Sequence, residues 1–308
     1  MNHNDIKGMI PATILPMDEK YQPDYDAYGK YLEWLIDNDA VAFAVNMDTG
    51  EGPQLSVEER RLAIEMAVRV ADGRVKVLAG VMGSTTADAV EMAQTYKDAG
   101  ADGVVVFPNA AFRNDPLDPK VPVSYHRSIG EEAGLPIILF QLAPVFGGVS
   151  YSRETLIELL KIPQVIGIKE ASFDAQHYAY TVETVKMVDR PLTILTGNDR
   201  FILESFLMGA EGALLGFGAI GCGMIAEMLD NIATGEYQEA VNMKSRVQGF
   251  GDFIYQDPVL DYRARCKIAL AHVGVIPPEV TYVRPPLLQI GEEESAQIKH
   301  ALQNADML

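Results

Sequence analysis

The sequence predicts an α/β protein that folds as a (β/α)8 barrel, a TIM barrel, with a C-terminal helical extension. Eight short apolar runs rich in β-branched residues alternate with longer amphipathic stretches. The chain has 308 residues, which is enough for a barrel of about 250 residues and an extension. An open doubly wound sheet is the alternative, but the first strand carries no G-x-G-x-x-G and no P-loop occurs anywhere.

The expected strands are apolar almost throughout, which is typical of parallel strands covered on both faces. They span residues 9–16, 40–45, 76–81, 102–108, 136–142, 165–171, 192–198 and 212–218. Eight such units, each followed by a helical stretch, favour closure into a barrel.

Helices are expected wherever apolar residues recur at steps of three and four. This spacing predicts helices over 24–38, 56–71 and 86–100, and Ser56 with Glu59 forms a capping box at the start of the second. After residue 218 the chain is helical in character. We predict a barrel over 1–232 and an extension over 233–308 that packs on it as one structural unit.

Composition limits the partners and the location. A net charge of −18 disfavours non-specific binding to nucleic acid or to an anionic membrane. No secretory signal and no apolar run of about 18 residues is visible, so a cytoplasmic protein is expected. The five histidines and two cysteines show no metal-ligand spacing, and neither a metal nor another cofactor is predicted.

Catalytic residues of such barrels lie where strands run into the following loops, and Lys169 occupies such a position after VIGI. In a partly apolar pocket a lysine pKa falls from about 10.4. The free amine can attack a ketone and form an iminium, which acts as an electron sink. The alternative is a lysine that reaches solvent or pairs with Glu170.

The loop MDTGEG follows the second strand and carries two glycines. Such a turn can present backbone N–H groups to an anion, and the Thr49 hydroxyl adds a donor. Thr49 and Gly50 are therefore candidates for binding a carboxylate, with an ordinary capped turn as the alternative.

Two aromatic residues follow strand ends. Phe140 and Phe217 are candidates for lining the substrate site, and packing inside the barrel is the alternative. The GND turn at 197–199 is expected to cap the next helix.

These residues resemble the dihydrodipicolinate synthase and N-acetylneuraminate lyase family of Schiff-base (class I) aldolase-type barrels, which act on pyruvate and related 2-keto acids. The likeness covers nearly the whole chain, from ATILPMDEK at 12–20 onward. Gly50 and Glu51 match the end of the family's G-x-x-G-E loop, and residues 167–171 match its G-I-K-E-A segment. The resemblance implies that Lys169 forms the Schiff base, that Thr49 and Gly50 hold the keto acid's carboxylate, and that the protein is a homo-oligomer, a tetramer or dimer.

The chain departs from the family pattern where protons move. The family's Y-N-x-P begins here with Phe140, and the arginine that follows in dihydrodipicolinate synthases is absent from VFGG at 145–148. The first Thr or Ser of the loop is Asp48. Asp48, beside the apolar Met47 and Phe140, is predicted to take over the proton shuttle, because a carboxyl group exchanges protons and a phenyl ring does not. The alternative is that Asp48 caps the turn.

The sequence thus predicts a lyase, either an aldolase or a hydro-lyase, that acts on a small pyruvate-like 2-keto acid through Lys169. The departures disfavour a true dihydrodipicolinate synthase. A non-catalytic keto-acid-binding paralogue is the main alternative, and a metal-dependent lyase is the third.

Overall fold

The computed structural model describes residues 1–114 and 116–308. Its parallel strands form one sheet in the order β1-β8-β7-β6-β5-β4-β3-β2. The strands are β1 Met9–Pro11, β2 Ala42–Val45, β3 Lys76–Val81, β4 Gly103–Val106, β5 Ile137–Leu142, β6 Val165–Ala171, β7 Thr193–Thr196 and β8 Gly212–Leu215. Single parallel bridges pair Met9 with Ala40 and Ala12 with Ala44, which closes the ring between β1 and β2. The predicted (β/α)8 barrel is confirmed.

The first strand is shorter than the predicted span of 9–16. Beyond Pro11 the backbone bonds to both neighbours in turn, because the Ala12 N–H donates to Leu215 O and the Thr13 N–H donates to Ala44 O, each at 3.0 Å. These alternating bonds join β1 to both sides of the ring without extending a continuous ladder.

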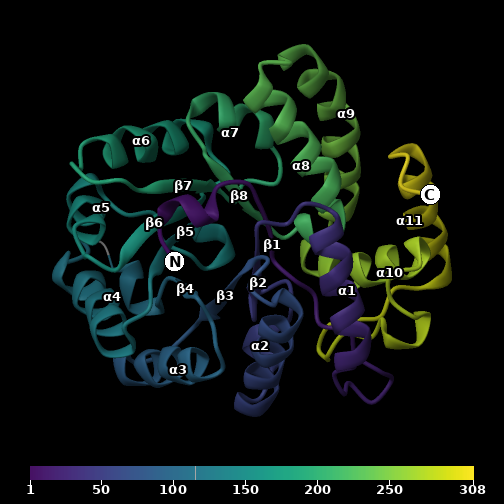
Figure 1. Ribbon diagram of the computed structural model, residues 1–308, viewed down its shortest axis with the longest axis horizontal. Helices are drawn as coiled ribbons and strands as arrows, with labels where there is room; N and C mark the ends of the chain where they lie inside the picture. The colour runs from purple at the N-terminus through teal and green to yellow at the C-terminus, as the bar shows by residue number, and fades with distance from the viewer. Residues whose placement is uncertain (115) are drawn as a thin grey trace.

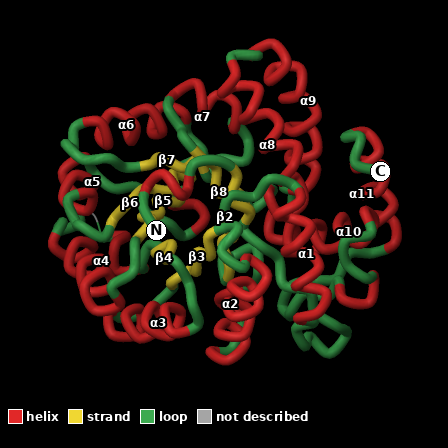
Figure 2. Tube along the Cα trace, in the orientation of Figure 1, coloured by secondary structure: helices red, strands yellow, loops and turns green. Residues whose placement is uncertain are grey.

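A ring of helices surrounds the strands (Figure 2). These helices are α1 Tyr25–Asp37, α2 Val57–Ala71, α3 Thr86–Asp98, α4 Lys120–Ala133, α5 Arg153–Leu160, α6 Ala175–Lys186, α7 Ile202–Met208 and α8 Gly218–Thr234. The three helices predicted before residue 100 are present within one or two residues of their expected ends. The capping box is present, since Ser56 Oγ accepts from the Glu59 N–H at 3.2 Å and Glu59 Oε2 accepts from the Ser56 N–H at 2.7 Å.

One end of the barrel is covered by the N-terminal segment, which crosses in front of the strands in Figure 1. The Ile6 side chain joins the apolar cluster inside the barrel. Thr193 Oγ1 donates to His3 O at 2.6 Å and ties the segment to the start of β7. The open end is therefore the opposite one, where the strands finish and the catalytic loops of such barrels lie.

The C-terminal extension consists of α9 Tyr237–Ile254, α10 Tyr262–Val273 and α11 Glu292–Asn304, which lie beside α8 and α1 (Figure 1). A fully buried ion pair, Lys267 Nζ to Glu51 Oε1 at 2.6 Å, joins α10 to the loop after β2. The division at 232/233 stays a prediction; α8 ends nearby, at Thr234. None of the helices described is long and apolar enough to cross a membrane.

Candidate active site

Lys169 lies on β6 directly opposite Phe140 of β5 in the strand register. The lysine is 8% exposed, and its Nζ lies 4.2 Å from the centroid of the Phe140 ring. The Phe140 ring also contacts Phe107 edge-on at 5.0 Å. The predicted lysine and aromatic residue therefore share one site, and the ring presents a π face to the amine.

Burial lowers the pKa of Lys169 from 10.5 to about 8, because the ammonium form loses its hydration. The carboxylates of Asp199 and Asp48 oppose this shift by favouring the charged form. The Phe140 ring acts in the same direction, since a cation over an aromatic face gains about 0.5–2 kcal/mol. Desolvation remains the largest of these effects, and a sizeable fraction of free amine follows at neutral pH.

The alternative pairing of Lys169 with Glu170 is not what the structure shows. Successive residues of a strand point to opposite faces, and the Glu170 carboxylate accepts from Asn198 Nδ2 at 2.8 Å. Burial raises the pKa of Glu170. Among the described residues, no ion pair involves Lys169.

The GND turn serves the site and does not cap α7, which corrects the prediction. The N-cap of α7 is Phe201, and no side chain caps it. A Cβ added at Gly197 would lie 2.7 Å from Lys169 Cε, so only glycine leaves room for the lysine stem. Asn198 binds Glu170, and Asp199 Oδ1 accepts from the Phe217 N–H at 3.0 Å. The turn thus supports the lysine strand and the β8 loop.

The β2 loop is a compact turn in which most N–H groups donate hydrogen bonds within the turn itself. Gly50 and Gly52 both donate to Met47 O, and Glu51 donates to Asp48 O. We find no acceptor for the Thr49 N–H within residues 1–114 and 116–308. A Cβ at Gly50 would lie 2.6 Å from Thr13 O, so the glycine permits close backbone packing. The predicted row of N–H groups free to bind an anion is therefore reduced, and the Gly50 N–H is not among those left.

Asp48 has charged neighbours rather than the apolar ones expected from sequence. Its carboxylate forms an ion pair with Arg263 of α10 and accepts from the Tyr262 hydroxyl at 3.0 Å. The Tyr262 hydroxyl also lies 3.3 Å from Thr49 Oγ1. The carboxylate is thus engaged by the extension, and none of its contacts in the described chain is the turn-capping bond proposed as the alternative.

Phe217 follows β8, and its ring is fully buried. The ring packs on Phe250 of α9 at 5.5 Å between centroids. This is the packing alternative, so the ring does not line an open site. Its backbone N–H contributes instead by binding Asp199.

The sequence that forms this site matches a known family over nearly its whole length. The model of the Dihydrodipicolinate synthetase family matches residues 5–305. This chain belongs to that family. A 4-hydroxy-tetrahydrodipicolinate synthase from Gluconacetobacter diazotrophicus is 26% identical over 302 residues, which is 98% of each chain.

Two solved structures share the fold. A prophage protein of the dihydrodipicolinic acid synthase family from E. coli K12, in complex with pyruvate, has a TM-score of 0.89 at 24% identity and covers 98% of this chain and 99% of its own. N-acetylneuraminate lyase from Fusobacterium nucleatum has a TM-score of 0.85 at 21% identity and covers 97% and 98%. The family match and the synthase relative identify the chain as an enzyme of the aldolase type.

Three residues at this family member's site were not predicted from sequence. They are Asp199 from the GND turn and two tyrosines of the extension, Tyr255 and Tyr262. A Cβ at Gly216 would lie 2.3 Å from the Tyr255 hydroxyl and 3.2 Å from Thr49 Oγ1, so these hydroxyls meet beside the β8 loop. The GND motif could have indicated Asp199, but no sequence signal brings α9 and α10 to the barrel mouth.

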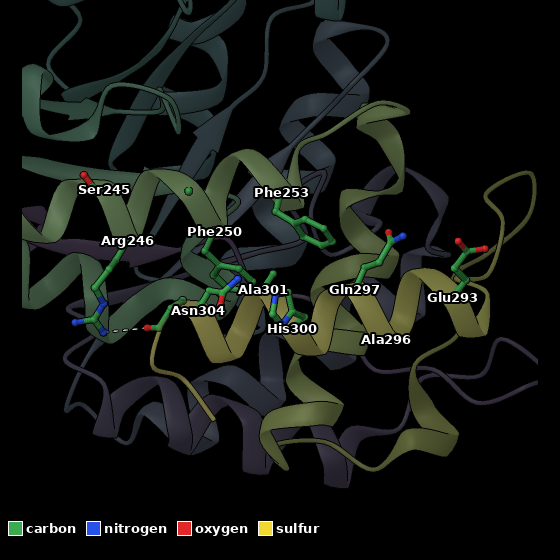
Figure 3. Close-up of a pocket in the computed structure, with 12 residues that line it drawn as sticks. Ser245, Arg246, Phe250, Phe253, Glu293, Ala296, Gln297, His300, Ala301 and Asn304 are labelled. Atoms are coloured by element: carbon green, nitrogen blue, oxygen red, sulfur yellow. Dashed lines mark hydrogen bonds between the residues drawn. The ribbon is translucent and has the colours of Figure 1, made fainter.

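A separate cavity of about 700 Å³ lies between α9 and α11 (Figure 3). Its lining includes Phe250, Phe253 and His300, and none of the predicted site residues. Phe250 also packs on Phe217, so this ring separates the cavity from the β8 loop. Within the described chain, no cluster of three His, Cys, Asp or Glu residues is arranged to hold a metal ion.

Proposed function

We propose that this protein is a lyase that forms a Schiff base between Lys169 and a small pyruvate-like 2-keto acid. The observation that carries the proposal is a buried lysine at the end of β6 whose pKa is lowered to about 8. A fold relative was solved in complex with pyruvate. The amine would attack the keto carbon, and loss of water from the carbinolamine would leave a cationic iminium.

The β2 loop supplies groups for the keto acid's carboxylate. Thr49 offers its hydroxyl, and Gly50 allows the loop to lie against the barrel. Asp48 is proposed to exchange protons at the carbinolamine, with the Tyr262 phenol bridging its carboxylate and Thr49. Phe140 would flank the imine with its ring. Aldol cleavage and dehydration share this iminium, and the proposal covers both.

Reductive trapping tests the proposal. Pyruvate with borohydride should add the mass of a reduced keto-acid adduct, and peptide mapping should find it on Lys169. Lys169→Arg should abolish the adduct, because a guanidinium stays protonated. Lys299→Arg, on the exposed face of α11, is the matched control and should trap like the wild type. Absence of any adduct across a panel of 2-keto acids would favour a non-catalytic binding protein.

Dihydrodipicolinate synthase activity itself is the second candidate, because the similar curated relatives carry that name. Phe140 lacks a phenol, and the segment 145–148 lacks an arginine. However, the Arg113 guanidinium donates to Gly147 O, so a cation from the β4 loop reaches this segment. We propose that the enzyme is not an efficient synthase, since a site without the phenol should discriminate strongly against that reaction. Robust condensation of pyruvate with aspartate semialdehyde would overturn this part of the proposal.

A further inference from the structure

Two proton-bearing groups from distant parts of the chain meet beside Lys169. Asp199 follows β7, and Tyr255 is the C-cap of α9. A Cβ at Gly251 would lie 3.9 Å from Asp199 O, so this face of α9 packs on the GND turn. Residues four apart lie on the same helix face, which places Tyr255 over the same turn.

Asp199 is a nearly buried carboxyl group, 7% exposed. It accepts from the Phe217 N–H at 3.0 Å, and no ion pair of the described residues includes it. Burial raises its pKa from 3.8 to about 6, while the Phe217 N–H, Lys169 and the Tyr255 hydroxyl hold it from rising further. A carboxyl group with a pKa near the operating pH is suited to accept and return a proton.

The backbone on both sides of Tyr255 is fixed by hydrogen bonds near the Asp199 carboxyl group. Arg265, which is buried, donates to Ile254 O at 3.0 Å and to Gln256 O at 2.6 Å, on either side of Tyr255. The Tyr255 ring lies 5.0 Å from the ring of Tyr262. Burial raises the pKa of the Tyr255 phenol well above 10, so it acts as a neutral hydrogen-bond donor.

We propose that Asp199 is the base and then the acid of the reaction at the Lys169 imine, and that Tyr255 positions its carboxyl group. This inference rests on the proposed Schiff-base function. In this inference, Asp199 of the β7 loop and Tyr255 of the extension carry out the proton transfer at the carbon next to the imine. Proton exchange at the carbinolamine remains the proposed role of Asp48. The phenol absent at Phe140 is thereby replaced from another part of the chain.

The proton balance is the same for both reactions. In dehydration, the Asp199 carboxylate takes a proton from C3 of the iminium, and the C3–H electrons form the enamine as the C2=N pair moves to nitrogen. The nitrogen pair then re-forms C2=N, the C2=C3 electrons become C3=C4, and the C4 hydroxyl, protonated by the Asp199 acid, leaves with the C4–O electrons as water. In aldol cleavage, the carboxylate takes the C4 hydroxyl proton, the C3–C4 electrons form the enamine, an aldehyde leaves, and the acid returns the proton to C3.

Exchange of the pyruvate methyl protons in D2O tests the assignment without knowledge of the natural substrate. It requires only removal and return of a C3 proton, and proton NMR follows it at saturating pyruvate. Asp199→Asn should still give the borohydride adduct at Lys169, yet lose exchange by about 100-fold or more. Asp252→Asn, an exposed acid on α9, is the control and should exchange normally.

The pH profile separates a chemical role from a structural one. Wild-type exchange at saturating pyruvate should fall as the pH drops through about 6, because the base must be ionised. Three other titratable groups face Asp199: Lys169, Tyr255 and Cys266. Lys169 is held as the iminium at saturating pyruvate. Burial raises the pKa values of Tyr255 and Cys266, so neither titrates near pH 6. Tyr255→Phe should slow exchange about tenfold and move this acid limb to higher pH, since the phenol lowers the Asp199 pKa. Tyr237→Phe, exposed on α9, should change neither.

The outcomes distinguish this inference from the proposed function. No wild-type adduct at Lys169 would overturn the proposed function itself. A wild-type adduct with unchanged exchange in Asp199→Asn would overturn only the role of Asp199. If Asp199→Asn does not fold, the wild-type acid limb and its shift in Tyr255→Phe decide the question, and an unshifted limb would remove Tyr255 from the mechanism.

Discussion

The pH dependence of pyruvate trapping at Lys169 tests how burial acts on the proposed nucleophile. At low pyruvate, the initial rate of adduct formation follows the fraction of free amine in the unliganded enzyme. With the pKa lowered from 10.5 to about 8, about 10% of the lysine is free at pH 7, against about 0.03% for an unperturbed lysine. The structure therefore accounts for a gain of about 300-fold in reactive amine at pH 7.

The assay measures the reduced adduct by mass spectrometry at short times between pH 6 and pH 11. We expect the rate to rise almost tenfold per pH unit and to level off near pH 8. A rise that continues tenfold per unit beyond pH 10 would refute the argument that burial lowers this pKa. Lys169→Arg provides the blank for other lysines.

The same shift affects stability, which gives an independent measurement. Because the folded-state pKa lies below the unfolded one, the unfolded chain binds more protons between about pH 8 and 10.5, and stability rises with pH through that window. Below about pH 8 the folded protein bears the full free-energy cost of burying the Lys169 ammonium. Lys169→Met should therefore stabilise the protein at pH 7, by up to about 3 kcal/mol in urea unfolding. Equal or lower stability of the variant would show that the buried ammonium carries no such penalty.

The remaining predictions concern the loops around the lysine. Asp48→Asn should still trap pyruvate, but more slowly, and lose most turnover; unchanged turnover would remove Asp48 from the proton transfer. Gly197→Ala should reduce trapping strongly, because its Cβ would lie 2.7 Å from the lysine stem, whereas Gly249→Ala, which meets open space, should trap normally. Lys267→Met should destabilise the protein by roughly 3–5 kcal/mol in urea unfolding, because it leaves the fully buried Glu51 carboxylate without its partner. A double variant with Glu51→Leu should lose less, and an equal loss would contradict the charge argument.

The barrel was predictable because its strands are apolar on both faces and its helices carry clear start signals. The strands that the sequence placed at 76–81 and 165–171 have those bounds in the structure. The first strand is shorter than its apolar run, because such a run does not reveal where a chain begins to bond alternately to two neighbours. Lys169 was found for the same reason as its strand, since a charged residue stands out within such a run.

The surroundings of Asp48 could not be predicted, because they come from a helix more than 200 residues away in the chain. Sequence neighbours suggested an apolar setting, while Arg263 and Tyr262 supply a charged and polar one. The amphipathic pattern of the extension shows that its helices exist, but a hydrophobic period does not tell which barrel loop a helix end will meet. Tyr255 was missed on the same ground.

The loss of the phenol at Phe140 has an electrostatic consequence for the proposed reaction. Before reaction the buried lysine is partly a neutral amine, and a keto acid brings a negative charge to a site that already holds Asp199 and Asp48. In the proposed reaction this nitrogen, which lies 4.2 Å from the Phe140 ring centroid in the free protein, becomes a cationic iminium within the field of both carboxylates. Relative to the neutral amine that attacks the keto acid, these groups stabilise the iminium, and interactions that strengthen along the reaction are those that raise its rate. In the proposed reaction Phe140 therefore acts on the charge of the imine nitrogen, while proton transfer requires residues with exchangeable protons, for which we propose Asp48 and Asp199.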